Sequence, residues 1–316
     1  MTAEAGTTEF EQITSNILMV RPSNFGFNLD TADNNSFQKN DLGLLRIEII
    51  EEARKEFDAL VTLLLYSGIQ VHIHQEKEGA TSTDSVFPNN WFSCHKDGSF
   101  ITYPMFSEKR RTERESEIIK ELGEKYQIKE YLRLEKWEKE DLFLEGTGSM
   151  VLDRQHKIAY ACKSNRTSET VLDEFCAVMG YSKFLFDAVD RMGFPIYHTN
   201  VMMAVCEAFV IICFDAIPCE KQKADLKKAF GQTKKEIIRI SLAQIAQFAG
   251  NVIQIGNSRD DSYLIMSTSA FNSLISGQIN AIEKHTKILH SDLKVIETFG
   301  GGSARCMIAE IFLPPN

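Results

Sequence analysis

The chain has 316 residues, of which 43% are hydrophobic and 25% are charged, so it carries enough apolar material for a large core. Its formal net charge of −9 argues against nucleic acid or an anionic membrane surface as a partner. The polar start of the chain lacks the features of a signal peptide, and no apolar run approaches the roughly 20 residues that a membrane span needs.

One order of elements recurs along the chain after a first strand at 16–21 and a polar loop from Pro22 to Gln38. Each unit has a helix, a strand, a polar loop and outgoing strands. The first helix is expected to follow a cap at Asn40 or Asp41 and to end near Tyr66. Further helices are expected at 108–126, 168–192, 220–248 (broken near Gly231) and 269–289.

The strands of these units follow from short apolar or alternating runs. The strands after the helices are expected at 69–73, 128–134, 194–197, 252–255 and 294–298. The outgoing strands are expected at 91–94 with 100–103, 150–152 with 158–161, 201–206 with 209–214, 263–266, and from Cys306 onward. Five α/β units with a period of roughly 60 residues predict a closed ring, in which the N-terminal strand completes the last unit. We expect residues 1–316 to form a single domain, with about residues 1–15 flexible.

Cys306 follows the glycine-rich stretch Gly300–Gly302, and Arg305 stands directly before it. Glycines allow tight turns and close backbone approach, and a neighbouring cation favours the nucleophilic thiolate. These features indicate a nucleophile, although a small buried cysteine in a last strand remains an alternative interpretation. No Cys-x-x-Cys pair or zinc spacing occurs among the seven cysteines, so the sequence predicts free thiols in the cytoplasm, no metal and no cofactor.

In a ring of equivalent units, the corresponding loops meet at one end of the axis. The loops carry Asn89 with Asn90, Glu145, His198, Asn257 and Cys306. Glu145 alone fits a turn carboxylate and His198 alone fits a loop histidine. Their occurrence at the same point of successive units predicts a site in which thiol, imidazole and carboxylate act together.

Four segments in this order resemble the guanidino-group-modifying (pentein) superfamily: Leu144–Gly148, Ser164–Thr167, Tyr197–Asn200 and Gly300–Cys306. The resemblance spans nearly the whole chain and is strongest to the citrulline-utilisation hydrolase, arginine deiminase-related or amidinotransferase branch. It implies a five-bladed α/β propeller. It also implies that Cys306 is the nucleophile, His198 the general acid and base, and Glu145 the carboxylate that binds the terminal nitrogens of the substrate.

The resemblance further implies substrate-binding residues. Arg166 matches the arginine that binds the substrate α-carboxylate, so Arg166→Ala is expected mainly to weaken binding. The segment that contains Asn90 ends at His95, where relatives usually have an aspartate, and Asn200 stands where arginine deiminases have another. We expect Asn90, His95, Asn200 and Arg305 to contribute to binding. The loss of negative charge favours a neutral ureido group or a modified guanidine over plain arginine.

The residue types suit a C–N bond hydrolase without a cofactor, because thiolate attack splits one difficult step into two and an imidazole can move both protons. The expected substrate is a small guanidino or ureido amino acid such as arginine or citrulline. Two alternatives stay open: an amidinotransferase that uses an amine in place of water, and a non-catalytic binding protein on the same fold. A homo-oligomer is also possible.

Two more expectations concern particular segments. The loop from Pro22 to Gln38 is expected to cover the site, with Asn24 and Asn28 on the amino-acid end of the substrate, and hydrogen exchange with a bound analogue tests this. Cys306 is expected to be the only functionally reactive thiol of the seven.

Overall fold

The computed structural model describes residues 11–28, 30, 35, 37–39, 43–114 and 116–316. The expected helix cap at Asn40 or Asp41 lies outside these residues, as does most of the stretch 1–15 that was expected to be flexible. Gln12 belongs to that stretch and is buried, with its side-chain amide donating to Leu152 O at 2.9 Å.

The described chain forms five three-stranded sheets with one common order, in which the middle strand is antiparallel to one neighbour and parallel to the other. Four of them follow one another along the chain: β3 (Phe92–Cys94), β4 (Ser99–Thr102) and β5 (Glu130–Arg133); β6 (Met150–Asp153), β7 (Ile158–Cys162) and β8 (Ser182–Phe186); β9 (Met203–Val205), β10 (Phe209–Ile212) and β11 (Glu236–Arg239); β12 (Ile253–Gly256), β13 (Ser262–Ser267) and β14 (Lys287–Ser291).

The fifth sheet joins the two ends of the described chain. Strand β1 (Asn16–Arg21) lies antiparallel to β15 (Ala309–Glu310), with Ile17 opposite Glu310, and parallel to β2 (Gln70–Gln75). The expectation that the N-terminal strand completes the last unit is therefore confirmed by the pairing.

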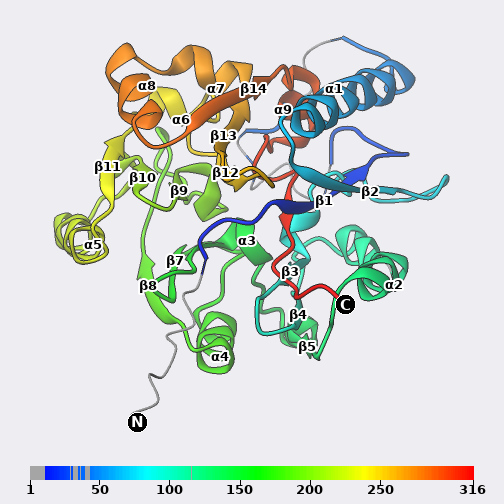
Figure 1. The fold of residues 1–316 in the computed structure, drawn as a ribbon, viewed down its shortest axis with the longest axis horizontal. Helices are drawn as coiled ribbons and strands as arrows, with labels where there is room; N and C mark the ends of the chain where they lie inside the picture. Colours follow the sequence, from blue (N-terminus) through cyan, green and yellow to red (C-terminus); the bar gives the residue numbers. More distant parts are fainter. Residues whose placement is uncertain (1–10, 29, 31–34, 36, 40–42, 115) are drawn as a thin grey trace.

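Helices connect the parallel strands, because two parallel neighbours need a crossover connection. The crossover helices are α1 (Arg46–Tyr66), α2 (Ser116–Lys125), α4 (Glu169–Met179), α5 (Glu220–Gln232), and the pair α7 (Thr268–Ser273) and α8 (Ser276–Glu283). In Figure 1 helices α1, α2, α4, α5 and α8 lie around the outside of the molecule, while β1, β3, β7, β9 and β12 lie nearer its centre.

Short helices occupy the turns between these elements. The short α-helices are α3 (Gly146–Ser149), α6 (Leu242–Ile245) and α9 (Lys294–Gly300). The 3₁₀ helices are η2 (Pro88–Asn90), η3 (Lys109–Glu113), η4 (Leu134–Glu140), η5 (Thr199–Val201) and η6 (Phe214–Ala216). Helices η2, α3 and η5 directly precede β3, β6 and β9, and so occupy equivalent places in three successive sheets.

Several expected boundaries are wrong. Strands β8 and β11 lie inside the helices predicted at 168–192 and 220–248, and β14 overlaps the end of the helix predicted at 269–289. The strand predicted at 294–298 is helix α9, and 194–197 contributes only an isolated bridge from Pro195 to Val189. The helix predicted at 108–126 is divided into η3 and α2. Cys306 lies in a turn, and the last strand begins at Ala309 instead.

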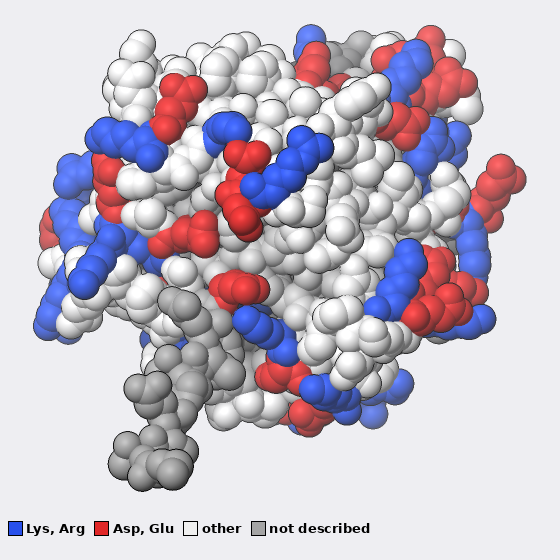
Figure 2. Space-filling model, viewed as in Figure 1, with Lys and Arg blue, Asp and Glu red and all other residues white. Residues whose placement is uncertain are grey.

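The apolar core is divided among several clusters, and β1 contributes to two of them. Ile17 and Met19 point into one cluster, while Leu18 and Val20 point into another, as the period of two in a strand dictates. The face in Figure 2 carries acidic and basic side chains side by side. Within the described ranges, no helix combines the length and apolar character needed to cross a bilayer.

Candidate active site

Glu145 stands directly before α3, and the glycines after it make room for its neighbours. Gly146 has a φ of +46°, and a Cβ on it would lie 2.5 Å from Asn89 O. A Cβ on Gly148 would lie 2.8 Å from the His198 ring. Glycine at these two positions therefore lets η2 and the imidazole approach Glu145 closely.

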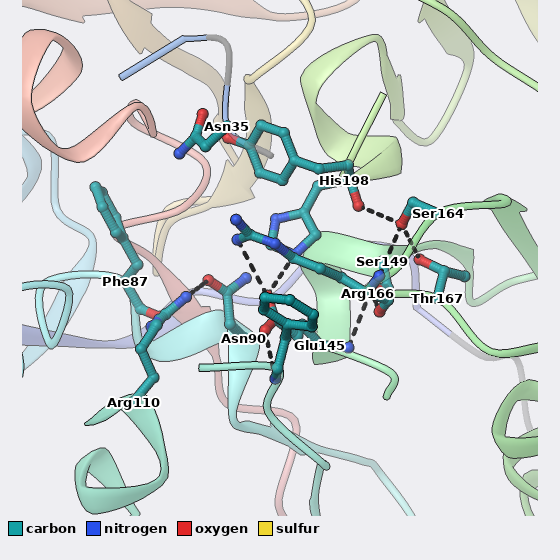
Figure 3. Close-up of polar contacts among 12 residues, drawn as sticks. Asn35, Phe87, Asn90, Arg110, Glu145, Ser149, Ser164, Arg166, Thr167 and His198 are labelled. Carbon is teal, nitrogen blue, oxygen red and sulfur yellow. Dashed lines mark hydrogen bonds and ion pairs between the residues drawn. The ribbon is translucent and has the colours of Figure 1, made fainter. Parts of the chain in front are cut away.

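The Glu145 carboxylate is buried and accepts three contacts (Figure 3). Its Oε1 accepts a hydrogen bond from Phe106 N at 3.0 Å. Its Oε2 lies 2.7 Å from His198 Nε2 and 3.5 Å from Arg166 Nη1. Burial alone would raise the pKa of Glu145, but the Arg166 charge and the His198 contact outweigh burial and hold that pKa well below its usual range. Glu145 is thus a carboxylate at neutral pH.

His198 precedes η5 and is placed by the residues on both sides of it. Thr199 Oγ1 donates to Ser149 O at 2.6 Å, which joins η5 to the end of α3. Tyr197 Oη donates to Gly301 O at 2.7 Å, which joins the same segment to the glycine stretch. Burial lowers the pKa of His198 to about 4 despite the hydrogen bond with Glu145, so the imidazole is neutral at physiological pH.

Arg166 lies on a loop that is fixed through its backbone. Ser149 Oγ donates to Arg166 O at 2.6 Å, and Arg166 N donates to Ser164 Oγ at 3.1 Å. The guanidinium carbon lies 4.6 Å from the centre of the Tyr197 ring and 6.0 Å from that of Phe106. Stacking on these rings leaves the edge of the guanidinium directed at Glu145 (Figure 3).

Cys306 is buried in a turn that begins at Ser303. Cys306 N donates to Ser303 O at 2.9 Å. Two side-chain amides approach the sulfur: Asn251 Nδ2 at 3.1 Å and Asn200 Nδ2 at 3.5 Å. Asn200 belongs to η5, two residues after His198, so the thiol lies against the segment that carries the imidazole. Burial raises the pKa of Cys306, and the hydrogen bond from Asn251 opposes that rise.

The glycine stretch before this turn is closely packed. A Cβ on Gly300 would lie 2.7 Å from the Phe87 ring, and Gly301 takes a φ of +65° as the residue that ends α9. A Cβ on Gly301 would also lie 2.6 Å from the Asn35 side chain. The described part of the 22–38 loop therefore contacts this stretch, and its expected role as a cover stays a prediction.

A second buried cluster adjoins Glu145; its members Asn90 and Asn28 were predicted, whereas Arg110, Glu113 and Asp84 were not. Arg110 Nη1 donates to Asn90 Oδ1 at 2.9 Å, and its Nε donates to Glu113 Oε1 at 2.9 Å. Arg110 Nε also lies 3.8 Å from Asp84 Oδ2, which accepts a hydrogen bond from Asn28 Nδ2 at 2.7 Å. Burial raises the pKa of Asp84, with the Arg110 charge opposing it. The cluster thus contains cationic and anionic groups that suit a zwitterionic ligand.

Three polar atoms of this region have no hydrogen-bond partner among the described residues: Asp84 Oδ1, Asn90 Nδ2 and Asn200 Oδ1. Buried polar atoms are nearly always paired, so orphaned ones indicate a place for a ligand or water. Asp84 and Asn90 belong to the cluster around Arg110, and Asn200 contacts Cys306.

The structure places three of the expected binding residues elsewhere. His95 contacts Ser93 Oγ at 2.8 Å and Arg154 Nη1 at 3.5 Å, beyond the far end of β3. Asn90, at the start of that hairpin, reaches the site in its place. Arg305 turns away to Ile308 O and to Glu310, both at 2.9 Å.

Asn24 is likewise engaged outside the cluster, because its Nδ2 donates to Ala80 O and Ser82 O at 3.1 Å each. Asn28 donates to Asp84 Oδ2 and so belongs to the cluster around Arg110. All seven cysteines are free, and only Cys219 is exposed. No group of three side chains suited to a metal ion occurs in the part of the chain that the structure describes.

Three residues of the site were missed in the sequence, because the residues next to them give little indication of a functional role. Asp84 precedes Phe87–Asn90 closely enough to have been suspected. Arg110 lies in the run Lys109–Arg111, which looks solvated, and only Arg110 of the three is buried. Asn251 precedes an apolar strand, and nothing local separates it from Asn257, which was considered instead.

The chain superposes on solved structures of an arginine dihydrolase, of AgrE and of a dimethylarginine dimethylaminohydrolase. The N-terminal domain of ArgZ bound to substrate, an arginine dihydrolase from the ornithine–ammonia cycle in cyanobacteria, superposes with a TM-score of 0.72 at 15% identity, covering 95% of this chain and 98% of that chain. AgrE with L-arginine gives a TM-score of 0.72 at 17% identity, over 95% of this chain and 40% of that chain. Dimethylarginine dimethylaminohydrolase with S-methyl-L-thiocitrulline gives 0.61 at 15%, over 95% and 100%.

At these identities the likeness to solved structures shows the fold alone. Comparison with curated protein sequences gives no match. The family model for eukaryotic N,N-dimethylarginine dimethylhydrolase matches residues 21–313, which include every residue of the site described above. The resemblance to the guanidino-group-modifying superfamily is thereby confirmed, and the chain belongs to the eukaryotic N,N-dimethylarginine dimethylhydrolase family.

Proposed function

We propose that the chain hydrolyses a C–N bond in the guanidino or ureido group of arginine, citrulline or a related amino acid, through a covalent intermediate on Cys306. The observation that carries this proposal is the contact of Glu145 Oε2 with His198 Nε2 at 2.7 Å, beside a segment that reaches the Cys306 sulfur through Asn200. A nucleophile, a base and an orienting carboxylate are the groups that such a reaction needs.

The first half of the reaction forms a carbon–sulfur bond and breaks a carbon–nitrogen bond. His198 takes the proton of the Cys306 thiol, and the thiolate attacks the guanidino carbon. The resulting imidazolium gives its proton to the departing amine or ammonia. Glu145 binds the remaining N–H groups through charge-assisted hydrogen bonds and stabilises the imidazolium.

The second half returns the enzyme to its starting form. His198 takes a proton from water, the hydroxide attacks the carbon of the covalent intermediate, and the carbon–sulfur bond breaks. The thiolate recovers a proton from the imidazolium. Hydrolysis of a guanidino group thus consumes one water and gives a ureido product with one amine or ammonia, whereas an amidinotransferase would need an amine in place of that water.

The second cluster suits the amino-acid end of the substrate. The unpartnered Asp84 Oδ1 is placed to accept from an α-ammonium group, and Arg166 or Arg110 can bind an α-carboxylate. Asn90 and Asn200 are neutral, which suits a ureido group or a methylated guanidine better than two further carboxylates would. The family description names N,N-dimethylarginine, and this makes methylated arginines the first substrates to test.

The experiment is incubation of the purified protein with arginine, citrulline, methylated arginines and agmatine, without an added amine acceptor, followed by mass analysis of the products. We expect a ureido or amine product from at least one amino acid and none from Cys306→Ser. Product formation only when an amine is added would favour the transferase instead.

Labelling with chloroacetamidine tests the covalent role of the thiol directly. We expect stoichiometric modification mapped to Cys306, slowed by substrate, with no loss of activity in the control Cys219→Ser, which removes the exposed thiol. Full activity of Cys306→Ser, or substrate-protected labelling at Cys94, would overturn the assignment.

We also propose that the five sheets are the blades of a five-bladed α/β propeller formed by residues 1–316 as one domain. Their shared strand order and the pairing of β1 with β15 support this arrangement. The helices η2, α3 and η5 would then approach one another at one end of the axis, as the contacts of Gly146 and Gly148 require.

A further inference from the structure

Asn251 is a buried side chain between the segment that carries His198 and the turn that carries Cys306. It precedes β12 and is 1% exposed. Gly250 before it approaches η5 so closely that a Cβ would lie 2.3 Å from Val201 O. This approach places Asn251 against both η5 and the turn that begins at Ser303.

The two ends of the Asn251 amide have different partners. Its Oδ1 accepts hydrogen bonds from Ser303 N at 3.1 Å and from Cys306 N at 3.4 Å. Its Nδ2 lies 3.2 Å from Asn200 O and 3.1 Å from Cys306 Sγ.

These partners permit one orientation of the amide. With the oxygen and nitrogen exchanged, an NH₂ group would face two backbone N–H groups, and the oxygen would face the Asn200 carbonyl. Three of the four contacts thus fix which end is the donor, without any assumption about the sulfur. The remaining N–H is consequently directed at Cys306 Sγ.

We propose that Asn251 is a catalytic residue that stabilises the Cys306 thiolate by donating this hydrogen bond, in the hydrolytic reaction proposed above. Thiolate is an anion, and a donor held by other contacts needs no reorganisation when the charge forms. The same side chain fixes the backbone of the turn, so the position and the charge of the nucleophile depend on one residue.

The hydrogen bonds that stabilise the Cys306 thiolate come from uncharged donors and not from the charged groups nearby. Arg305 in the same turn is a cation that lowers the pKa of the thiol, and its guanidinium donates to Ile308 O and Glu310. The hydroxyl of Tyr197, beside His198, donates to Gly301 O, and burial raises its pKa, so it is uncharged at neutral pH. The hydrogen-bond donors that contact the Cys306 sulfur are therefore the uncharged side-chain amides of Asn251 and Asn200.

The test measures the rate of alkylation of the Cys306 peptide by iodoacetamide against pH, with the label located by mass. Thiolate reacts and thiol does not, so the midpoint of the profile reports the pKa of Cys306 independently of turnover. We expect Asn251→Ala to move the midpoint upward by about one pH unit or more, with about a tenfold slower reaction at neutral pH and a similar plateau at high pH.

Asn251→Asp keeps an acceptor for both backbone N–H groups and replaces the donor by a carboxylate. It is expected to shift the midpoint upward even if Asn251→Ala fails to fold. Asn257→Asp is the matched control, because Asn257 Oδ1 also accepts from two backbone N–H groups and its Nδ2 donates to Ser67 O, away from the thiol. The control is expected to leave the midpoint and the turnover unchanged.

An unchanged midpoint in folded Asn251→Asp would overturn the proposal, as would a lowered plateau with an unchanged midpoint, which indicates a purely structural role. The outcome is also separate from the proposed hydrolysis. A shifted midpoint in a protein that turns over no guanidino or ureido amino acid would reject the hydrolase and still support the action of Asn251 on the thiol.

Discussion

The charged residues of the site interact directly with one another. Arg166 is buried between aromatic rings and pairs with Glu145 at 3.5 Å, and Glu145 in turn contacts His198. Each of the three therefore sets the electrostatic environment of the other two. Substitutions at these positions are expected to affect binding, protonation and stability in separable ways.

Arg166→Ala is expected to raise KM about ten- to hundredfold, because a charge-assisted pair with the substrate carboxylate contributes roughly 1.5–3 kcal/mol. Steady-state kinetics with the best substrate measure this change. Arg133→Ala, which removes an exposed arginine from β5, is the control and should leave KM unchanged. Collapsed turnover with an unchanged KM would place Arg166 elsewhere in the mechanism.

The His198 pKa of about 4 predicts a pH dependence of stability. Between the unfolded pKa of about 6.5 and the folded value, the unfolded chain binds more protons, so the unfolding free energy falls as pH falls through this window. The shift corresponds to about 3 kcal/mol. Chemical unfolding from pH 7.5 to pH 4 is expected to show a smaller decline in His198→Gln than in the wild type or in the exposed control His290→Gln. Equal declines in all three proteins would contradict the shift.

At the residue scale, the sequence supported the selection of Glu145, His198 and Cys306, and the structure places them in one region. Each was selected because it falls in the loop after a predicted strand, although helix α9 precedes Cys306 and only an isolated bridge precedes His198. Arg110 and Asn251 could not be selected in this way, since their burial depends on chain segments far away. His95 was selected by counting along a segment, whereas a strand carries successive residues away from the site by about 3.3 Å each.

At the element scale, three outer strands, β8, β11 and β14, were missed from the sequence, whereas the equivalent strands β2 and β5 were predicted. Strand β8 has mostly exposed or half-buried residues, because only one of its edges is paired and its outer face meets solvent. Its apolar run, Phe184–Phe186, is only three residues long, and the helix pattern was extended through it. Gly180 at a φ of +67° is the local stop signal that ends α4. Strand β11 similarly follows Lys234, which takes a left-handed φ of +56°.

Helix α9 depends on another element for its start. Glu56 of α1 accepts hydrogen bonds from Val295 N at 2.8 Å and Ile296 N at 2.9 Å, so a distant carboxylate satisfies the first amides of the helix that leads to the glycine stretch. The sequence of 294–300 does not indicate this cap, because the acceptor lies in α1. The apolar run at 294–298 was therefore predicted to be a strand.

Glu56→Ala is expected to lower the unfolding free energy by about 1–3 kcal/mol, because it leaves two helix amides without their acceptor. Thermal and urea unfolding measure the loss, and hydrogen exchange at 294–300 should quicken. Glu51→Ala, an exposed position of the same helix, is the matched control. An effect of equal size in both variants would show that the helix propensity of α1, rather than the cap, is responsible.

At the scale of the whole molecule, five units could be counted from sequence because hydrophobic runs mark the buried strands of every sheet. The pairing of the first strand with the last could also be predicted from the sequence, because the N-terminal strand belongs to no unit of its own and needs a partner strand. Ile311 N donates to Asn16 O at 2.9 Å, which continues the contact of β15 with β1. Ile311 is 1% exposed in the cluster that also contains Leu18 and Trp91.

Ile311→Ala is expected to destabilise the fold by about 2–5 kcal/mol through the cavity that it leaves, while KM of the folded fraction stays unchanged. Differential unfolding monitored by circular dichroism measures the loss. Leu45→Ala, at a position 67% exposed, should change stability by less than about 0.5 kcal/mol. A similar small effect at Ile311 would show that the joined ends contribute little to the cooperativity of the molecule.

The pairing of Arg166 with Glu145 has a consequence for selectivity. Because Glu145 already has a guanidinium partner within the chain, an incoming guanidinium exchanges one cation for another and does not neutralise a bare carboxylate. The released Arg166 then requires an anion, which an α-carboxylate supplies. A guanidinium compound that lacks a carboxylate offers Arg166 no replacement for Glu145, and the loss of one partner from a buried ion pair costs roughly 3–5 kcal/mol. Under the proposed function, this exchange is therefore expected to favour amino acids over the corresponding amines.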